Sequence, residues 1–552
     1  MGLAVVVAVA AGVVSWQLTA GPADPLPGRE VRGGDPPTRT PLPPAPDVPP
    51  PAGAVRVEVG DDLQALVRDH PPGTSFLLAS GVHRQLSVEP RDGDRFTGEP
   101  GAVMSGAQLL DADAFRREGS AWVLDGVDAE GFVHGTMIEG HEREAHPEDL
   151  YADGQRLRHV EQLADLDTEH EWYLDYDADR LHLAADPGRW DLLELAVADF
   201  AFVGEGVRDV TIENLVVRHY ATPAQRGAIN GRHTVDWTVR SVDASSNHAY
   251  GLGTGPGMLV EHSRFAGNGQ AGIGGPGARH SESPVEPGGA RPLRVLSNEI
   301  ADNRQLGFYW RWEGGGTKFT LTSGMAFANN HVHGNDGPGL WWDIDNEDAV
   351  GCANLVEDNV IGIFPEIGQG ARVFWNEVHG NLRAGEEAAS TGIFVSNTSD
   401  VEIAHNVVSG QPLGILARDA DEEETGDHGP RRTTGLWVHD NVVAHDDHSG
   451  MRIETELTEG RDTVRFERNH WSVPDPEGRF WVLGDDADPI DWATWRDEGM
   501  DREGRVSTLV PDRRPVPASD VPRFTRTRYG PVPAGEDPPV HPSAASCADE
   551  LP

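Results

Sequence analysis

The sequence predicts an all-β protein that folds as a right-handed parallel β-helix, a solenoid in which each turn of the chain adds short strands to long parallel sheets. The first observation is a repeat. A glycine followed by a short apolar strand recurs at steps of 21 to 24 residues, which insertions lengthen to between 30 and 36 residues in half of the turns. The second observation is that no amphipathic helical pattern lies between the repeats. No helices are therefore expected to cover the apolar strands, and the strands of successive turns must bury one another by stacking. The repeats begin with GAING at 227, GLGTG at 251, GIGGP at 272, GFYWR at 307, GLWWD at 339, GIFPE at 362, GIFVS at 392, GILAR at 414 and GMRIE at 450.

A second strand in most turns carries an asparagine followed by an apolar residue. Such side chains can stack as an internal hydrogen-bonded ladder, one amide per turn. Leucine-rich repeats share the period, but their leucine spacing is absent here. The asparagines are Asn298, Asn330, Asn376, Asn406, Asn441 and Asn469.

The N-terminus predicts export. Residues 3–14, LAVVVAVAAGVV, form an apolar run of signal-peptide length, followed by small residues. The usual preceding basic residues are missing, so a cleaved signal peptide and a retained short anchor are both open. We expect a secreted or cell-surface tethered protein. Proline then dominates residues 21–53, which predicts an extended linker.

Composition narrows the class of partner. The 552 residues include 90 acidic and 45 basic residues, for a net charge of −45. A polyanion would be repelled over most of this surface, so we expect no nucleic-acid partner. We expect a monomer that meets a membrane only through an N-terminal anchor. The chain has only two cysteines, Cys352 and Cys547, and their spacing is not that of metal ligands. A scaffold of several disulfides is therefore excluded, whereas one long-range bridge stays open.

From about Val55 to Asp512 the chain resembles the pectate-lyase-like right-handed β-helix superfamily of exported bacterial proteins. The stretch FLLASGVHRQLSVEPRDGDRFTGEPGAVMSGA resembles its N-terminal capping turn, and LYADGQRLRHV with WYLDYDADRLHLAADP resembles a small β-insert of glycosidase-like members. The expected organisation is a signal peptide or short anchor over residues 1–20, a proline-rich linker over 21–53, an N-terminal cap with the first turns over 54–110, a β-rich insert over 111–198, a β-helix of nine or more coils over 199–475, and a C-terminal cap with a disordered tail over 476–552.

Aligning the glycines predicts columns of side chains, because equivalent residues of successive turns stack roughly 4.8 Å apart. We take the residue one past glycine as inward, and alternation then points positions two and four outward. The inward column is Phe308, Leu340, Ile363, Ile393 and Ile415; position two holds Tyr309, Trp341, Phe364, Phe394 and Leu416; position four holds Arg311, Asp343, Glu366, Ser396 and Arg418.

The outward aromatic column has two interpretations. An exposed column is costly in water, so it predicts a groove where sugar rings lie on aromatic faces. The alternative is that a loop covers the aromatics and makes a secondary core. Under the groove interpretation the substrate-binding residues are Tyr309, Trp341, Phe364, Phe394, Glu313 and Arg418.

The charged column contains the candidate catalytic residues. Asp343 and Glu366 lie 23 residues apart, one uninterrupted turn, and should be vertical neighbours. Two carboxylates that close cannot both ionise freely, so one should hold a proton unless a cation intervenes. Asp345 widens the acidic patch, and Arg311 ends a strand of the same face. An ordinary solvated acidic face is the plain alternative.

Lys318 is the only lysine in the chain and lies in GGGTKF, a glycine-rich loop expected beside these carboxylates. An amine has a tunable pKa that a guanidinium lacks, so it suits a base or an electrostatic stabiliser. The plain alternative is codon usage that disfavours lysine.

The strings GGTKF, GPGLWWDIDN and GIFPEI resemble the signature block of a group of secreted bacterial β-helix proteins. In that group a histidine often precedes the glutamate, where this chain has Pro365. The superfamily contains hydrolases, lyases, epimerases and non-catalytic binders, so the resemblance does not give the reaction.

The leading expectation is an exported enzyme that cleaves a polysaccharide by glycoside hydrolysis with paired carboxylates and needs no cofactor. The first rival is a lyase or uronate epimerase, with Lys318 or Arg311 as base and calcium held by the carboxylates. The second rival is a glycan-binding or envelope protein without catalysis.

Overall fold

The computed structural model describes residues 51–281, 283–286, 289–383, 390–419, 425–426, 429–444, 451–453, 463–484 and 488–508. The expected signal segment, nearly all of the proline-rich linker and the tail lie outside the described residues, as does Cys547. No helix within the described ranges is long and apolar enough to cross a membrane.

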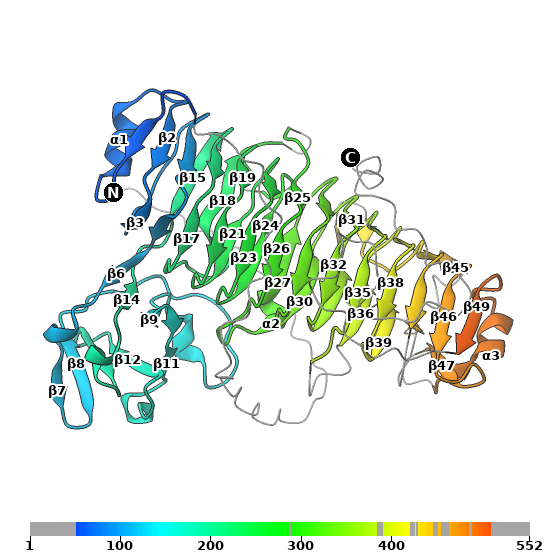
Figure 1. The fold of residues 1–552 in the computed structure, drawn as a ribbon. Coiled ribbons are helices and arrows are strands. Elements are labelled where there is room, and N and C mark those ends of the chain that lie inside the picture. Colours follow the sequence, from blue (N-terminus) through cyan, green and yellow to red (C-terminus); the bar gives the residue numbers. More distant parts are fainter. Residues whose placement is uncertain are drawn as a thin grey trace, which may run out of the picture. The chain divides into compact units, whose positions relative to one another are not determined.

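Three long sheets, here called A, B and C, confirm the predicted all-β parallel β-helix (Figure 1). Each turn of the chain passes through sheets A, B and C in succession, and the neighbouring strands within a sheet come from successive turns. Sheet A contains β1 (Val55–Val57), β2 (Ser75–Leu78), β4 (Arg95–Gly98), β16 (Thr211–Glu213), β19 (Thr238–Arg240), β22 (Leu259–Glu261), β25 (Arg294–Leu296), β28 (Ala326–Ala328), β31 (Val350–Cys352), β34 (Arg372–Phe374), β37 (Glu402–Ala404), β42 (Trp437–His439) and β45 (Arg465–Glu467).

Sheet B contains β3 (Gly81–Arg84), β5 (Ala102–Ser105), β17 (Val216–Arg218), β20 (Asp243–Ser245), β23 (Arg264–Ala266), β26 (Glu299–Ala301), β29 (His331–His333), β32 (Leu355–Glu357), β35 (Glu377–His379), β38 (Val407–Ser409), β43 (Val442–Ala444), β46 (His470–Val473) and β49 (Arg505–Thr508). Sheet C contains β15 (Phe202–Arg208), β18 (Gly227–Val235), β21 (Tyr250–Gly253), β24 (Ala271–Pro276), β27 (Gly315–Thr320), β30 (Pro338–Trp342), β33 (Ile361–Pro365), β36 (Thr391–Ser396), β39 (Leu413–Arg418), β44 (Met451–Ile453), β47 (Arg479–Leu483) and the antiparallel β48 (Ile490–Asp491).

A two-sheet insert separates β5 from β15 and has its own apolar core around Trp172. One sheet contains β6 (Ala107–Leu109), β9 (Leu150–Ala152), β10 (Gln155–Arg156) and β14 (Leu193–Ala196). The other contains β7 (Arg116–Glu118), β8 (Ala121–Asp125), β11 (Arg158–His159), β12 (Glu171–Asp175) and β13 (Arg180–Leu183). A separate two-stranded hairpin is β40 (Thr425–Gly426) with β41 (Gly429–Pro430).

Short capped helices stand at both described ends of the solenoid (Figure 1). α1 (Leu63–Asp69) begins after Asp62, whose side chain accepts a hydrogen bond from the Ala65 amide, and it buries Leu63. α3 (Trp492–Asp497) begins after Asp491, which caps the Thr494 amide in the same way. The remaining helices are α2 (Trp310–Glu313) and the single turns η1 (Ala112–Ala114), η2 (Glu142–Ala145), η3 (Leu163–Asp165) and η4 (Pro187–Arg189).

The interior of the solenoid is a continuous apolar column, as the alternation predicts. Leu340 pairs with Ile363, Ile363 with Ile393, and Ile393 with Ile415, and all four side chains are fully buried. Each strand therefore presents its next residue to the outer face of sheet C.

The predicted asparagine ladder is confirmed at the corner between sheets A and B. Asn298 donates its amide to Asn330 at 3.0 Å, and the same link repeats coil by coil to Asn469. The ladder also contains Asn354, which the sequence pattern missed, and ends on the carboxylate of Asp501. In full it runs through Asn298, Asn330, Asn354, Asn376, Asn406, Asn441, Asn469 and Asp501.

A second ladder, at the corner between sheets B and C, was not predicted. Its links are again amide to amide, at 2.9 to 3.2 Å between Nδ2 and Oδ1. Its members are Asn247, Asn268, Asn303, Asn335, Asn359 and Asn381. Two of the three corners are thus held by stacked amides.

Removing one asparagine of the first ladder should destabilise the protein. We expect Asn376→Ala to lower the free energy of unfolding by about 2–4 kcal/mol, because it leaves the buried backbone and side-chain amides of Asn354 without their acceptor. Denaturant unfolding measures this. The control is Gln155→Ala, an exposed amide of the insert, which should cost less than about 0.5 kcal/mol. Equal costs would contradict a structural role for the ladder.

Candidate active site

The lysine lies on a strand of sheet C, not on a loop. β27 runs through Lys318, and Phe319 pairs with Trp342 of β30, which places Lys318 level with Trp341. On its other side Lys318 pairs with Gly274 of β24. Lys318 therefore occupies position two of the outward column, beside the aromatics.

The expectation that Phe308, Tyr309 and Arg311 continue the columns is wrong. Tyr309 immediately precedes the short helix α2, and Arg311 is an exposed residue of that helix, with its guanidinium 5.0 Å from the Trp310 ring centre. The string GFYWR thus precedes the strand of its coil. GGTKFT supplies that strand, and its Gly316 lies 23 residues before Gly339, the basal period of the repeat.

The charged column is otherwise as predicted. Trp342 pairs with Pro365, so the next residues, Asp343 and Glu366, are vertical neighbours on adjacent coils. Glu366 bridges to Ser396, and Ser396 pairs with Arg418. The Arg418 Nε donates to the Ser396 hydroxyl at 3.4 Å.

Four side chains form the centre of the site: Lys318, Trp341, Asp343 and Glu366. The Lys318 Nζ lies 2.8 Å from Asp343 Oδ2, and both side chains are under one-tenth exposed. The same Nζ lies 4.2 Å from the centre of the Trp341 ring, over its face. The Trp341 indole donates from Nε1 to Glu366 Oε2 at 2.8 Å. The tryptophan therefore contacts the cation through its face and the second carboxylate through its edge.

Backbone groups also hold the first carboxylate in place. Asp343 Oδ1 accepts the Ile344 amide at 2.8 Å, so its two oxygens have different partners. The Asp343 amide itself donates to the Phe319 carbonyl at 2.9 Å.

The aromatic column is covered. The structure therefore agrees with the alternative in which these side chains form a secondary core rather than an open groove. Trp341, Phe364 and Phe394 are 3, 4 and 6% exposed and form an apolar cluster with Trp310 of α2 and Leu416. The rings stack on one another, at 5.7 Å between the first two centres and 4.5 Å between the next two. Their faces are therefore occupied, and they do not form an open groove in this structure.

The remaining candidates make their main contacts outside the four central side chains. The carboxylate of Asp345 forms an ion pair with Arg431, and its carbonyl accepts from Arg279 at 2.6 Å. The Arg418 guanidinium lies 4.8 Å from the Phe394 ring centre. Glu313 ends α2, and its side chain lies outside what the structure describes.

The insert reaches this face of the solenoid, which sequence reasoning missed. Met137 forms an antiparallel bridge with Phe308, and the Tyr309 amide donates to the Thr136 carbonyl at 2.8 Å. The Gly307 amide donates to Glu144 Oε2 at 2.7 Å. Tyr309 remains 38% exposed beside this junction. No local sequence motif predicts these contacts, because they join segments more than 160 residues apart.

The two central carboxylates have different electrostatic surroundings. Burial, and then the negative charge of Asp343, raises the pKa of Glu366 to about 8, while Lys318, Trp341 and Arg418 oppose the shift. Asp343 instead contacts the ammonium directly. At neutral pH this arrangement keeps a proton on Glu366 and places it beside the Lys318–Asp343 ion pair of the neighbouring coils.

The raised pKa of Glu366 makes stability depend on pH. The native state keeps this proton to about pH 8, whereas the unfolded chain releases it near pH 4.5. Because the native state binds more protons between these values, its stability falls as pH rises from about 5 to 8. We therefore expect Glu366→Gln, which keeps the shape and cannot ionise, to raise Tm at pH 8.5 but not at pH 4.5. An unchanged Tm at both values, measured by thermal denaturation, would contradict the assigned proton.

Residues 227–408 match the family model described as right handed beta helix region. Comparison with curated proteins gives no match. Among solved structures, the chain resembles XylC in its complex with xylose, at a TM-score of 0.61 and 14% identity over 83% of this chain and 84% of that chain.

Two further structures are less similar. The A-module of the Azotobacter vinelandii mannuronan C-5 epimerase AlgE6 gives a TM-score of 0.42 and 12% identity over 83% of this chain and 98% of that one. A mannuronic acid specific polysaccharide family 6 lyase from human gut microbiota gives 0.43 and 10% over 83% and 91%. These identities are too low to carry a reaction. The family match, the XylC likeness and the three parallel sheets agree: the protein has the right-handed parallel β-helix fold.

Proposed function

We propose that the protein is an exported glycoside hydrolase that cleaves a polysaccharide with retention of anomeric configuration, using Glu366 as the acid and base and Asp343 as the nucleophile. The observation that carries the proposal is the pair of carboxyl groups on adjacent coils in different electrostatic surroundings. Glycosidases need one carboxyl group that is protonated and one that is ionised.

Glu366 suits the role of general acid. A carboxyl group that keeps its proton to about pH 8 can donate it to the leaving oxygen at neutral pH. The Trp341 indole fixes one of its oxygens, which orients the group. After the first step the same group, now ionised, can take a proton from water.

Asp343 suits the role of nucleophile. The Lys318 ammonium lies 2.8 Å from its Oδ2, and the Ile344 amide donates to its other oxygen, so both oxygens are held in place. Neighbouring strands lie roughly 4.8 Å apart, near the separation of about 5–5.5 Å between the carboxyl groups of retaining enzymes. Inverting enzymes need a wider gap that admits a water molecule.

The fold comparison supports a sugar substrate in one respect. XylC, the similar structure with a TM-score of 0.61, was solved with xylose. Export is supported by the apolar segment at 3–14 and the proline-rich linker after it. Of the aromatic residues predicted to bind substrate, Tyr309 has the exposure that stacking on a sugar requires, at 38%.

The lyase or epimerase alternative is less well supported. It needs an unprotonated Lys318 or Arg311 as base, yet Lys318 is ion-paired to Asp343 and Arg311 lies on α2 outside the charged column. It also needs calcium near the carboxylates, where the ammonium already supplies the positive charge. Absorbance from an unsaturated uronide, or loss of activity with a chelator, would support this alternative instead.

Glu366→Gln and Asp343→Asn test the proposal together. We expect each to lower kcat roughly 10²- to 10⁴-fold on whichever member of a panel of bacterial and plant polysaccharides yields reducing ends. NMR of the first-formed anomer should show retention. Binding without release of reducing ends by the unaltered protein would support the glycan-binding alternative.

Lys318 tests the electrostatic account. We expect Lys318→Met to lower kcat at least about tenfold, because Asp343 Oδ2 loses the cation that holds it in place. Lys318→Arg, which keeps the charge, is the matched control and should retain more activity. Equal kcat in the unaltered protein and in Lys318→Met would show that the lysine does not position Asp343.

Tyr309 tests substrate contact. We expect Tyr309→Ala to raise KM several-fold with little change in kcat, the pattern of lost uniform binding. Leu163→Ala, at a 43% exposed site on the insert, is the control. A fall in kcat alone would show that Tyr309 acts by holding α2 in place.

A further inference from the structure

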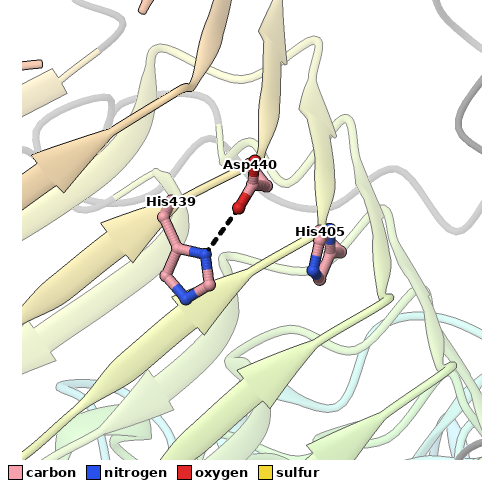
Figure 2. Close-up of side chains that lie close together, drawn as sticks. All are labelled: His405, His439 and Asp440. Carbon is pink, nitrogen blue, oxygen red and sulfur yellow. Dashed lines mark hydrogen bonds and ion pairs between the residues drawn. The ribbon is translucent and has the colours of Figure 1, made fainter. Parts of the chain in front are cut away.

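Two histidines and an aspartate gather on sheet A, on different strands from the candidate active site (Figure 2). His405 follows β37 directly, and His439 ends the neighbouring strand β42, where it pairs with Ala404. Asp440 is the next residue, at a left-handed corner with φ of 53°. The three groups thus come from two consecutive coils.

Their ligand atoms converge. One nitrogen from each ring and one carboxylate oxygen all lie within 4.8 Å of one another. His439 Nδ1 lies 2.8 Å from Asp440 Oδ2, the contact drawn in Figure 2. Ligand atoms around a bound transition metal lie about 2.0–2.2 Å from the ion, so small side-chain movements would bring all three into range.

Neighbouring groups fix the ring orientations. Glu402 Oε1 lies 3.0 Å from His439 Nε2, which directs the other nitrogen of that ring toward Asp440. Trp437 stacks on His439 with 3.8 Å between ring centres, and Trp375 stacks on His405 at 5.9 Å. A carboxylate behind a histidine ring is the usual partner of a metal-binding imidazole.

A guanidinium shares the carboxylate. Arg468, on the following coil, donates to Asp440 Oδ2 at 2.7 Å and to Oδ1 at 3.0 Å. It satisfies part of the negative charge and would repel a second cation. A carboxylate has enough lone pairs to accept both a guanidinium and a metal ion, so Arg468 should weaken binding without preventing it.

We propose that His405, His439 and Asp440 form a binding site for a divalent transition metal, with Zn²⁺ as the preferred ion and water completing the coordination. Two imidazoles and one carboxylate suit zinc, whereas calcium and magnesium prefer oxygen ligands. Because the ligands lie on adjacent coils, a bound ion would link β37 to β42. This site is independent of the proposed hydrolysis.

The test uses the full chain without an affinity tag, stripped with a chelator and titrated with zinc chloride. Calorimetry should show a binding event that His405→Ala weakens at least about tenfold. His405 is exposed, so the variant should fold. His170→Ala, another exposed histidine, is the control for unspecific binding and should match the unaltered protein.

Arg468→Gln should change the zinc affinity in the opposite direction. Removing the competing charge should tighten zinc binding roughly tenfold and increase the zinc-dependent rise in Tm. Tighter binding by Arg468→Gln together with weaker binding by His405→Ala supports the site. Zinc affinity that is unchanged in His405→Ala, or that Arg468→Gln fails to strengthen, would overturn it.

Discussion

The structure depends on one constraint: equivalent residues of successive coils stand one strand spacing apart. For amides this is favourable, because each asparagine both donates and accepts, and a stack of them leaves no buried polar group unpaired. Both ladders exploit it, from Asn298 to Asn469 and from Asn247 to Asn381. For carboxylates the same spacing is unfavourable, and the stacking of Asp343 under Glu366 has to be offset locally.

The offset comes from two residues of the preceding coils. Lys318 neutralises Asp343, and its ammonium also lies on the face of Trp341, whose edge donates to Glu366. The buried aromatic column keeps water away from these contacts, which strengthens them. The aromatics that suggested an open sugar-binding groove are therefore better understood as a buried apolar cluster beside Glu366 and the Lys318–Asp343 ion pair.

The sequence predicted the strands of coils that follow the regular repeat. It failed in the one coil where two glycine-led strings could each be the strand. The inward column from Leu340 to Ile415 and the vertical pair Asp343 and Glu366 follow from period and alternation alone. The coil that contains Lys318 has two glycine-led strings, and the more apolar one, GFYWR, was chosen as its strand. The 23-residue step from Gly316 to Gly339 was the available signal for the other. The contact of Met137 with Phe308 was beyond prediction, because it depends on how the insert folds back onto the coils.

The first ladder ends on a different functional group. Asn469 donates to the carboxylate of Asp501, which also accepts from the Trp471 indole at 2.8 Å. An aspartate side chain lacks the NH2 group with which each asparagine donates to the next coil, so the chain of amides has a direction and a last member. A further coil would find no amide donor at this corner to continue the stack. Asp501 therefore closes the first ladder at the C-terminal end of the described coils.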